Sequence, residues 1–373
     1  MTTHQYQFEP GASFFLPEIM TRIPARAHHK VDDIELRSAA WVRQNLAFAF
    51  ASEQHLERYL LTRCAYFACL IWPMTRDEWM LDLANLSQYL FAFDDAYGDR
   101  AGIGRDSKSA WKVFDDFFVV MAGDSPRSGH PYALIFQDIW GRVALPMTAG
   151  QRSRHRKATE DWLKDCVREI ASREKGIVFD FDTYLAVRRG SVYSTPCFPI
   201  IEHGLGIELP EHFCTSRELA DLHLLCTDCM ILINDLFSFQ KEALDGDFVN
   251  AVTILCMRHE LGLQQAVDRV CEILHAAEGT FLEKCRDMLA NNEDLRPILS
   301  PYLTALGDYM SGLLHWARLT TRYHGSGYVW NGLTSGIVTL GKTGTIMSPR
   351  QRPERDAAAQ SAAERSGELG LTR

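Results

Sequence analysis

Apolar residues recur at helical spacing along most of the chain, from about Trp41 to Tyr323. In the stretches 56–67, 81–93 and 267–282 they fall three or four positions apart, as on one face of an α-helix. The alternating pattern that indicates strands, bounded by paired turn signals, is scarce. The sequence therefore predicts an all-α protein with roughly ten or more helices.

Turn-forming residues interrupt this pattern without creating a domain linker. Breaks are predicted at 72–73, 101–102, 123–131, 145–146, 209–210 and 296–301. We find no internal repeat, so residues 31–340 are expected to form a single domain. Residues 1–30, which contain three prolines, are expected to form an extended arm. Residues 341–373 contain few apolar residues and no aromatic residue, which predicts a disordered tail.

The composition excludes several classes of function. Hydrophobic residues make up 46% and charged residues 23%, which is typical of a globular protein. The net charge of -9 and the absence of a basic stripe argue against nucleic-acid binding. We see no stretch of about 20 uncharged apolar residues, and the first residues do not resemble a signal peptide. A cytoplasmic protein without a membrane span is expected.

The ten cysteines lack the spacing of a disulfide scaffold. Most lie within apolar helical stretches, so we expect reduced thiols in the core. Cys226 and Cys229 form a CxxC pair, but no second pair or His-x-x-x-His pattern accompanies them. Two buried cysteines on one helix are favoured over half of a zinc site.

A first acidic cluster follows an apolar helix. Asp94, Asp95 and Asp99 come directly before the glycine-rich stretch 101–104. Asp95 and Asp99 share a helix face and Asp94 lies beside them, so the cluster can offer oxygen ligands to a hard divalent cation. Carboxylates are also unfavourable near a helix C-terminus, which favours a functional role. The pair Asp115-Asp116 precedes apolar residues instead, and we expect it to be structural.

A second polar stripe follows the apolar residues 229–233. Asn234, Ser238 and Glu242 are spaced i, i+4, i+8 and fall within about 80° on a helix, with Lys241 on the same stripe. A core face would carry apolar residues at these positions. Magnesium bound by the three oxygen-bearing side chains, with the lysine contacting a bound phosphate, accounts for all four residues.

These two motifs resemble the signatures of microbial class I terpene synthases, an aspartate-rich DDxxxD-type motif and an ND-x-x-S-x-x-K-E motif. In that family a diphosphate-sensing arginine lies 46 positions before the asparagine, and Arg188 stands at that distance from Asn234. The family also ends its catalytic domain with an Arg-Tyr pair that grips the diphosphate. Arg322-Tyr323 stands in the corresponding region.

The resemblance implies a helical bundle around a central apolar cavity, and an enzyme that ionises a linear isoprenyl diphosphate and cyclises the cation. It implies a trinuclear Mg2+ cluster completed by the substrate diphosphate, with Mn2+ as a substitute. Asp94, Asn234, Ser238 and Glu242 would hold the metal. Asp95 and Asp99 would respond to substrate through salt bridges. The diphosphate would be held by Arg188, Lys241, Arg322 and Tyr323.

Two positions after the sensor arginine depart from the family pattern. Where the family often has Asp or Thr followed by Gly, this chain has Ser191 and Val192. The role ascribed to the second position belongs to its backbone carbonyl, which a valine also has. A valine allows fewer backbone conformations than a glycine, so the geometry of the expected helix break is in question.

Three aromatic side chains are predicted to line the cavity. Phe91 lies one turn before the first acidic pair, Trp316 lies seven residues before Tyr323, and Phe67 stands at the family's usual offset before the first motif. Aromatic faces stabilise cations by roughly 0.5 to 2 kcal/mol each. For each residue, packing in the core is an alternative.

The sequence alone leaves other substrates and functions open. Farnesyl diphosphate is the first choice of substrate and geranylgeranyl diphosphate the second. A chain-elongating prenyltransferase carries two DDxxD motifs, and here the stretch from Asn234 to Glu242 replaces the second. A non-catalytic helical scaffold is disfavoured by the intact ligand residues. The sequence leaves a monomer or a homodimer open.

Overall fold

The computed structural model describes residues 8–98, 106–245 and 249–341. The expectations for Asp99 and for the tail from residue 342 onward fall outside the described residues. The described part is dominated by helices, which confirms the all-α prediction. The helices are α1 (Val31–Asn45), α2 (Glu53–Leu60), α3 (Cys64–Ile71), α4 (Asp77–Gly98), α5 (Ser107–Met121), α6 (Pro131–Val143), α7 (Ala149–Glu174), α8 (Phe181–Ser191), α9 (Cys197–Leu205), α10 (Glu211–Cys214), α11 (Arg217–Asp245), α12 (Ala251–Arg258), α13 (Leu263–Asn291), α14 (Arg296–Leu319) and α15 (Thr321–His324), with 3-10 turns at Ala47–Ala49 and Glu293–Leu295.

Four predicted breaks, at 72–73, 123–131, 145–146 and 209–210, fall at junctions between helices, and the one at 101–102 lies outside the described residues. Helix α3 ends before Pro73, α6 begins with Pro131 at its first position, and α9 is followed by Gly206, whose φ of 65° suits a residue without Cβ. The predicted break across 296–301 is wrong, because α14 begins at Arg296 and runs through Pro301. This proline lies so near the helix start that its missing N–H removes a single early hydrogen bond.

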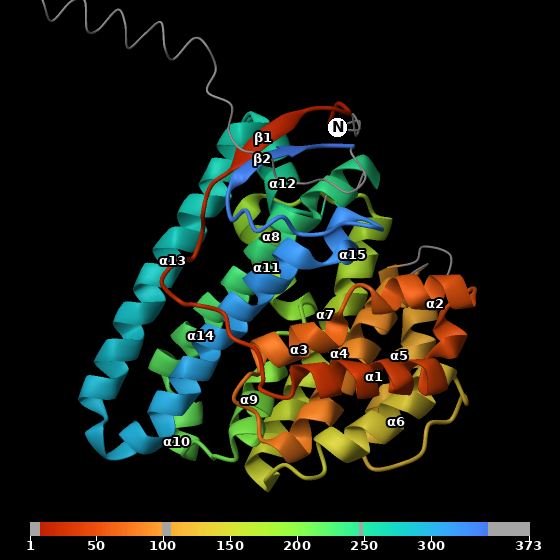
Figure 1. The fold of residues 1–373 in the computed structure, drawn as a ribbon. Helices are drawn as coiled ribbons and strands as arrows, with labels where there is room; N and C mark the ends of the chain where they lie inside the picture. The colour runs from red at the N-terminus through yellow and green to blue at the C-terminus, as the bar shows by residue number, and fades with distance from the viewer. Residues whose placement is uncertain (1–7, 99–105, 246–248, 342–373) are drawn as a thin grey trace, which may run out of the picture.

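Helix α11 runs through the middle of the bundle and packs against α8, α12, α13, α14 and α15 (Figure 1). By length and composition it is the one described helix that could cross a membrane. However, 72% of its most apolar stretch is buried inside the fold, as expected of the central helix of a globular domain. Helix α4 lies across the bundle against α3, α1 and α6. The two predicted motifs therefore lie on α4 and α11.

Two short strands tie the N-terminal segment to the end of the described chain. Strand β1 (Ser13–Leu16) pairs antiparallel with β2 (Gly336–Thr339), and the pair lies at one end of the bundle (Figure 1). Ion pairs attach the following segment to the helices. Arg22 binds the buried Glu278 of α13, and Arg26 binds the buried Asp308 of α14.

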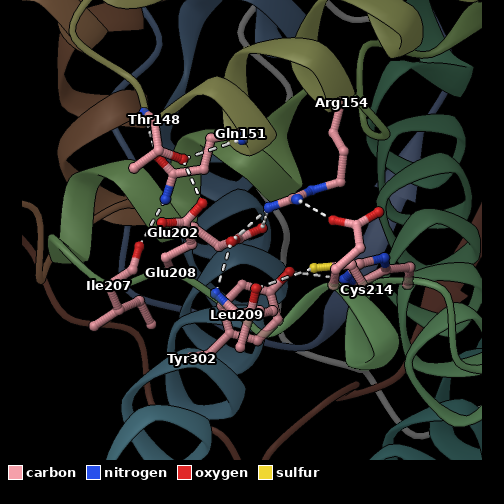
Figure 2. Close-up of polar contacts among 11 residues, drawn as sticks. Thr148, Gln151, Arg154, Glu202, Ile207, Glu208, Leu209, Cys214 and Tyr302 are labelled. Atoms are coloured by element: carbon pink, nitrogen blue, oxygen red, sulfur yellow. Dashed lines mark hydrogen bonds and ion pairs between the residues drawn. The ribbon is translucent and has the colours of Figure 1, made fainter.

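A buried polar network fixes the opposite end of the bundle, where α9 and α10 lie (Figure 2). The carboxylate of Glu202 on α9 is 2% exposed and accepts two hydrogen bonds from Arg154 of α7, at 2.7 and 2.9 Å. It also accepts one from the backbone N–H of Leu209. Because a buried charge is stable only when it is paired, this network holds the α9–α10 loop against the start of α7.

Candidate metal and diphosphate site

A cavity of about 230 Å³ lies in the middle of the bundle. Its lining comes from α3, α4, α7, α8, α9, α11, α14 and α15, so no single helix forms it. Apolar and aromatic side chains make up most of its wall, and the charged and amide groups on it are Asp94, Glu169, Arg188 and Asn234. The lining residues are Phe67, Ile71, Trp72, Ser87, Leu90, Phe91, Phe93, Asp94, Trp162, Cys166, Glu169, Arg188, Ser191, Val192, Tyr193, Cys197, Met230, Asn234, Tyr309, Leu313 and Tyr323.

Side chains from both motifs line this cavity. Asp94 comes from the last turns of α4 and Asn234 from α11, and Arg188 and Tyr323 share the same space. The two motif helices therefore face each other across open space. A larger hollow of about 420 Å³ lies on the surface between α5, α6 and α7, and its lining among the described residues contains none of the motif residues.

Arg322 connects the two carboxylates of the first motif. Its guanidinium lies 2.8 Å from Asp94 Oδ2 and 2.8 Å from Asp95 Oδ1. The arginine side chain is 13% exposed, whereas the two carboxylates are 65% and 47% exposed. Burial lowers the pKa of Arg322, but the Asp95 and Asp94 carboxylates raise it more, so the guanidinium stays charged. The pair therefore places a permanent cation beside the acidic cluster.

The second motif presents its oxygen atoms differently. The amide nitrogen of Asn234 donates to the Tyr323 hydroxyl at 2.6 Å, which leaves the amide oxygen as the atom that can bind a cation. Ser238 is 3% exposed, and its hydroxyl has no hydrogen-bond partner among the described residues. A buried hydroxyl without a partner is unfavourable, and such groups often mark the site of an absent ligand.

The end of the second motif lies nearer the surface. Lys241 is exposed, and it acts electrostatically on Asp94 together with Arg322 and Arg188. Glu242 is half-buried, and its carboxylate accepts a hydrogen bond from Asn250 at 2.8 Å. Of the second motif, Asn234 lines the cavity, whereas Ser238, Lys241 and Glu242 are not among its lining residues.

Arg188 and Arg189, adjacent in sequence, have different surroundings. Arg188 lines the cavity, where Nη1 lies 3.4 Å from Glu169 of α7 and 3.4 Å from the Ser191 hydroxyl. Its Nε atom is buried and has no partner among the described residues. Burial lowers the pKa of Arg188, but Glu169 and other nearby acidic groups raise it well above its ordinary value. Arg189 points away from the cavity and forms a bidentate pair with Asp228 of α11.

Asp235, the second residue of the ND motif, faces away from the cavity. It is 1% exposed and accepts hydrogen bonds from the Tyr184 hydroxyl at 2.5 Å and the Ala251 backbone N–H at 2.8 Å. Burial raises its pKa to about 6, and Arg188 and the Tyr184 hydrogen bond oppose this shift. Asp235 lies on α11 and accepts from Tyr184 of α8 and Ala251 of α12, so it joins these three helices. Tyr184 stands one turn before Arg188 on α8.

Helix α8 ends at Ser191, and Val192 adopts an extended conformation with φ of -79° and ψ of 137°. Residues with a side chain readily adopt these backbone angles, so a glycine is not required at this break. The Ser191 carbonyl accepts a hydrogen bond from the Trp162 indole at 2.9 Å, and the Val192 carbonyl accepts one from Ser194. The valine at position 192 therefore does not prevent helix α8 from breaking at this point.

The three predicted aromatic residues form one cluster but do not all reach the cavity. Phe67 and Phe91 line it, with ring centroids 5.3 Å apart. Trp316 is fully buried, and its ring lies 5.0 Å from Phe67 and 5.1 Å from Phe91. Its indole N–H donates to the Thr62 carbonyl at 2.9 Å. Contrary to the prediction, Trp316 packs behind the wall, because its N–H requires a partner in the core.

Two structural interpretations are confirmed. Cys226 and Cys229 are buried free cysteines. Asp116 is buried and accepts hydrogen bonds from the backbone N–H groups of Arg127 and Ser128, which fixes the loop between α5 and α6. Both features therefore stabilise the fold.

The oxygen atoms fit a hard divalent cation. Asp94 offers an exposed carboxylate, Asn234 an amide oxygen on the same cavity, and Ser238 a buried hydroxyl that lacks any other described partner. Such hard oxygen donors suit Mg2+ or a similar ion, and no thiol or imidazole lies among them. Outside this region, His28, His29 and Asp77 lie close enough to share an ion. Both ring nitrogens of His28 are already used, by the Thr75 carbonyl and the Lys30 N–H.

Sequence reasoning missed the roles of Glu169, Tyr184 and Asn250. Glu169 lies among many charged residues of α7, and nothing in its sequence marks it as facing a cavity. Tyr184 is one turn before Arg188, a spacing without a known signature. Asn250 directly precedes the apolar residues of α12, which is a recognisable N-cap pattern, but its second partner Glu242 could not be inferred.

A family model described as "Terpene synthase family 2, C-terminal metal binding" matches residues 85–279, which is more than half of the chain. The match includes both motifs and Arg188, while Arg322 and Tyr323 lie beyond it. Named relatives agree with the match. The chain is 27% identical over 327 residues to the alpha-muurolene synthase of Coprinopsis cinerea, covering 85% of this chain and 75% of that protein. It is 25% identical over 313 residues to the germacrene A synthase of Nostoc punctiforme, covering 83% of this chain and 95% of that protein.

Solved structures show the same fold. The linalool/nerolidol synthase from Streptomyces clavuligerus superposes with a TM-score of 0.72 at 22% identity, covering 81% of this chain and 100% of that one. An a-eudesmol synthase superposes with the same TM-score at 20% identity, covering 81% and 98%.

The helical bundle around this cavity has the fold of solved terpene synthases, and the matching family model defines the class as a metal-binding terpene synthase. The chain belongs to terpene synthase family 2 and is a microbial class I terpene synthase. It is therefore a lyase that acts on isoprenyl diphosphates and forms terpenes, and its family is a metal-binding one.

Proposed function

We propose that this enzyme uses Mg2+ to ionise farnesyl diphosphate and cyclises the farnesyl cation to a sesquiterpene hydrocarbon or alcohol. The observation that carries the proposal is the shared cavity, which Asp94 of α4 and Asn234 of α11 both line beside Arg188 and Tyr323. An apolar space that ends in oxygen ligands and cations suits a molecule with a hydrocarbon chain and a charged diphosphate.

The proposed metal ligands are Asp94, Asn234, Ser238 and Glu242. If these side chains hold a divalent metal, it would supply positive charge against the negative charge that the diphosphate gains when the carbon–oxygen bond breaks. The unpartnered hydroxyl of Ser238 supports this assignment, because a metal ion would satisfy it. Asn234 holds its oxygen in a fixed direction through the hydrogen bond from its nitrogen to Tyr323.

Four side chains are proposed to hold the diphosphate. Arg188 and Arg322 stay charged despite their burial, and their guanidinium groups can each donate two hydrogen bonds to phosphate oxygens. Tyr323 donates from its hydroxyl, and Lys241 adds a positive charge at the mouth of the site. The electron pair of the broken bond stays on the leaving diphosphate, which these donors stabilise. Asp95 responds through its ion pair with Arg322, and we propose that Asp99 acts in the same way.

The rest of the cavity protects and folds the cation. Phe67, Phe91 and Trp162 line the cavity, where aromatic rings can stabilise a positive charge, and the apolar wall excludes water. The Arg322 guanidinium already lies over the Phe91 ring, 5.1 Å from its centroid. The carbonyl of Ser191 is held by the Trp162 indole, and the carbonyl of Val192 lies at the adjoining helix break. We propose that the dipoles at this break face the allylic end of the substrate.

The names of the relatives favour a 15-carbon substrate over a 20-carbon one. Several relatives are named as sesquiterpene synthases, including one from Cyclocybe aegerita that is 25% identical over 329 residues.

The test is to incubate the purified enzyme separately with geranyl, farnesyl and geranylgeranyl diphosphate and Mg2+, without isopentenyl diphosphate. We expect a cyclic 15-carbon product from farnesyl diphosphate, detected by gas chromatography with mass spectrometry, and no product after EDTA treatment. If only geranylgeranyl diphosphate gives a product, the proposed substrate farnesyl diphosphate is wrong. Turnover that persists in EDTA would refute the metal-dependent mechanism.

Substitutions test the site itself. Asn234→Ala or Glu242→Ala is expected to abolish turnover while the fold, followed by circular dichroism, is preserved. Full activity in the Asn234 variant would overturn the assignment of the metal ligands.

A further inference from the structure

Asn250 is a fully buried asparagine at the start of α12, and both polar atoms of its side chain form hydrogen bonds. Its side-chain oxygen accepts from the Val252 backbone N–H at 2.9 Å, which caps the helix. Its side-chain nitrogen donates to the Asp235 backbone carbonyl at 2.8 Å and to the Glu242 carboxylate at 2.8 Å. One side chain therefore joins the start of α12 to two points of α11.

The partners of Asn250 fix the orientation of its amide. A backbone N–H can only donate, so the atom that faces Val252 must be the oxygen. A carbonyl and a carboxylate can only accept, so the atom between Asp235 and Glu242 must be the nitrogen. A rotated amide would lose all three hydrogen bonds, and the donor is therefore held toward Glu242.

The surroundings of Asn250 are themselves rigid. Asp235 accepts from the Ala251 backbone N–H and from Tyr184, so the first residues of α12 are attached to α11 and α8. The amide consequently has little freedom to follow a moving carboxylate. Glu242, in contrast, has a long side chain and stands near the C-terminal end of α11, where the helix dipole disfavours a negative charge.

We infer that Asn250 is a positioning residue that holds the Glu242 carboxylate in the direction required for binding a divalent metal. The inference rests on the proposed function, because it takes Glu242 to be a metal ligand. Asn250 would not touch the metal or the substrate. It would lower the cost of ordering Glu242, as hydrogen-bond partners of metal ligands do, and their loss typically weakens metal affinity about 10- to 100-fold.

The test separates the two functions of Asn250. In Asn250→Ser the hydroxyl can still cap α12, but it is too short to reach Glu242. Asn250→Ala loses both contacts. Ser52→Ala removes the N-cap of α2, whose hydroxyl accepts from the His55 N–H, and serves as a control for capping alone.

Binding of Mn2+ in the presence of inorganic diphosphate, followed by isothermal titration calorimetry, is the main measurement. We expect Mn2+ affinity to fall about 10- to 100-fold in Asn250→Ser and Asn250→Ala. Ser52→Ala should keep the affinity of the wild type although its melting temperature falls. In turnover assays, the Mg2+ concentration for half-maximal rate should rise in Asn250→Ser, while the rate at saturating Mg2+ changes less.

Unchanged Mn2+ affinity in a folded Asn250→Ser variant would overturn the inference. If that variant fails to fold, Asn250→Asp keeps both the shape and the cap but places an oxygen against Glu242, and its Mn2+ affinity should fall as well. Glu242→Ala distinguishes a failure of the inference about Asn250 from a failure of the proposed metal site. If Glu242→Ala loses Mn2+ binding while the Asn250 variants keep it, the inference fails alone. If Glu242→Ala binds Mn2+ normally, the proposed metal site fails with it.

Discussion

The guanidinium of Arg322 lies 2.8 Å from the carboxylate of Asp94, so a proposed diphosphate ligand is paired with a proposed metal ligand. A second bond joins the same guanidinium to Asp95. A metal ion on Asp94 and a diphosphate on Arg322 would each compete with this ion pair. Whichever binds first therefore removes a cost that the other would otherwise meet, and the two ligands should bind cooperatively.

Arg322→Gln is predicted to release Asp94. Mn2+ alone should bind this variant more tightly than it binds the wild type, because no cation competes for the carboxylate. Inorganic diphosphate should bind more weakly, because a donor is lost. Coupling between such sites is typically about 5- to 150-fold, and we expect the enhancement of Mn2+ affinity by diphosphate to shrink by a factor in this range.

Arg189→Gln is the matched control. It removes an arginine that follows Arg188 in the sequence, is paired with Asp228 and does not line the cavity. Calorimetric titrations with each ligand alone and with both together give the coupling. Equal coupling in the wild type and in Arg322→Gln would contradict this prediction.

Ser238→Ala should separate stability from function. The Ser238 hydroxyl is buried without a described partner, and an unsatisfied buried hydroxyl costs about 1–3 kcal/mol. Its removal is therefore expected to leave the free energy of unfolding unchanged or to raise it by about 1 kcal/mol, as measured by urea denaturation in EDTA. Mg2+-dependent turnover should fall strongly, because a metal ligand is lost.

Ser38 of α1 provides a matched comparison, since its hydroxyl is also buried without a described partner. Ser38→Ala should behave like Ser238→Ala in denaturation but retain wild-type turnover. Should Ser238→Ala destabilise the protein by more than about 1 kcal/mol, its hydroxyl has a partner and the metal assignment weakens.

The helices and the shared face of the second motif could be predicted from the sequence, because both depend on local periodicity. Asn234, Ser238 and Glu242 share a face of α11 by spacing alone, and the apolar residues before them place that face inside the bundle. Likewise, Arg188 lies on the cavity at the position its distance from Asn234 suggested.

Contacts between distant helices could not be predicted in the same way. Asn250 and Glu242 meet because the chain turns back between α11 and α12, and the direction of that turn depends on Asp235 and Tyr184. The spacing predicts one helix for Trp316 and Tyr323, but they lie on α14 and α15, with the extended Thr320 between them. The depth of Trp316 depends on the Thr62 carbonyl, which lies far away in sequence. Tertiary packing decides such contacts, and periodicity says little about them.

The different depths of Phe67 and Trp316 predict different effects of their substitution. Phe67 lines the cavity, so Phe67→Ala should change the product mixture, measured by gas chromatography, with a modest loss of stability. Trp316 is fully buried behind it, and Trp316→Ala should reduce the free energy of unfolding by about 3–5 kcal/mol. Similar melting temperatures for the two variants would show that Trp316 is not the deeper residue.

His155 is predicted to make the protein less stable in mild acid. It is 2% exposed, stacks on Trp140 and bonds to the Pro196 carbonyl. Burial lowers its pKa to about 4, from an ordinary value of 6.5. Because the folded state resists protonation, its contribution to stability is complete above pH 6.5 and is lost as the pH falls from 6.5 to about 4.

His155→Asn removes this titration and keeps a side-chain N–H that can donate to Pro196. The loss over the full window is about 3 kcal/mol for a shift of this size, so the free energy of unfolding should fall by up to that much more in the wild type than in the variant between pH 7 and pH 4. Urea denaturation at several pH values measures the difference. Since every other titrating group is common to the two proteins, parallel pH profiles would mean that His155 becomes protonated without unfolding the protein around it.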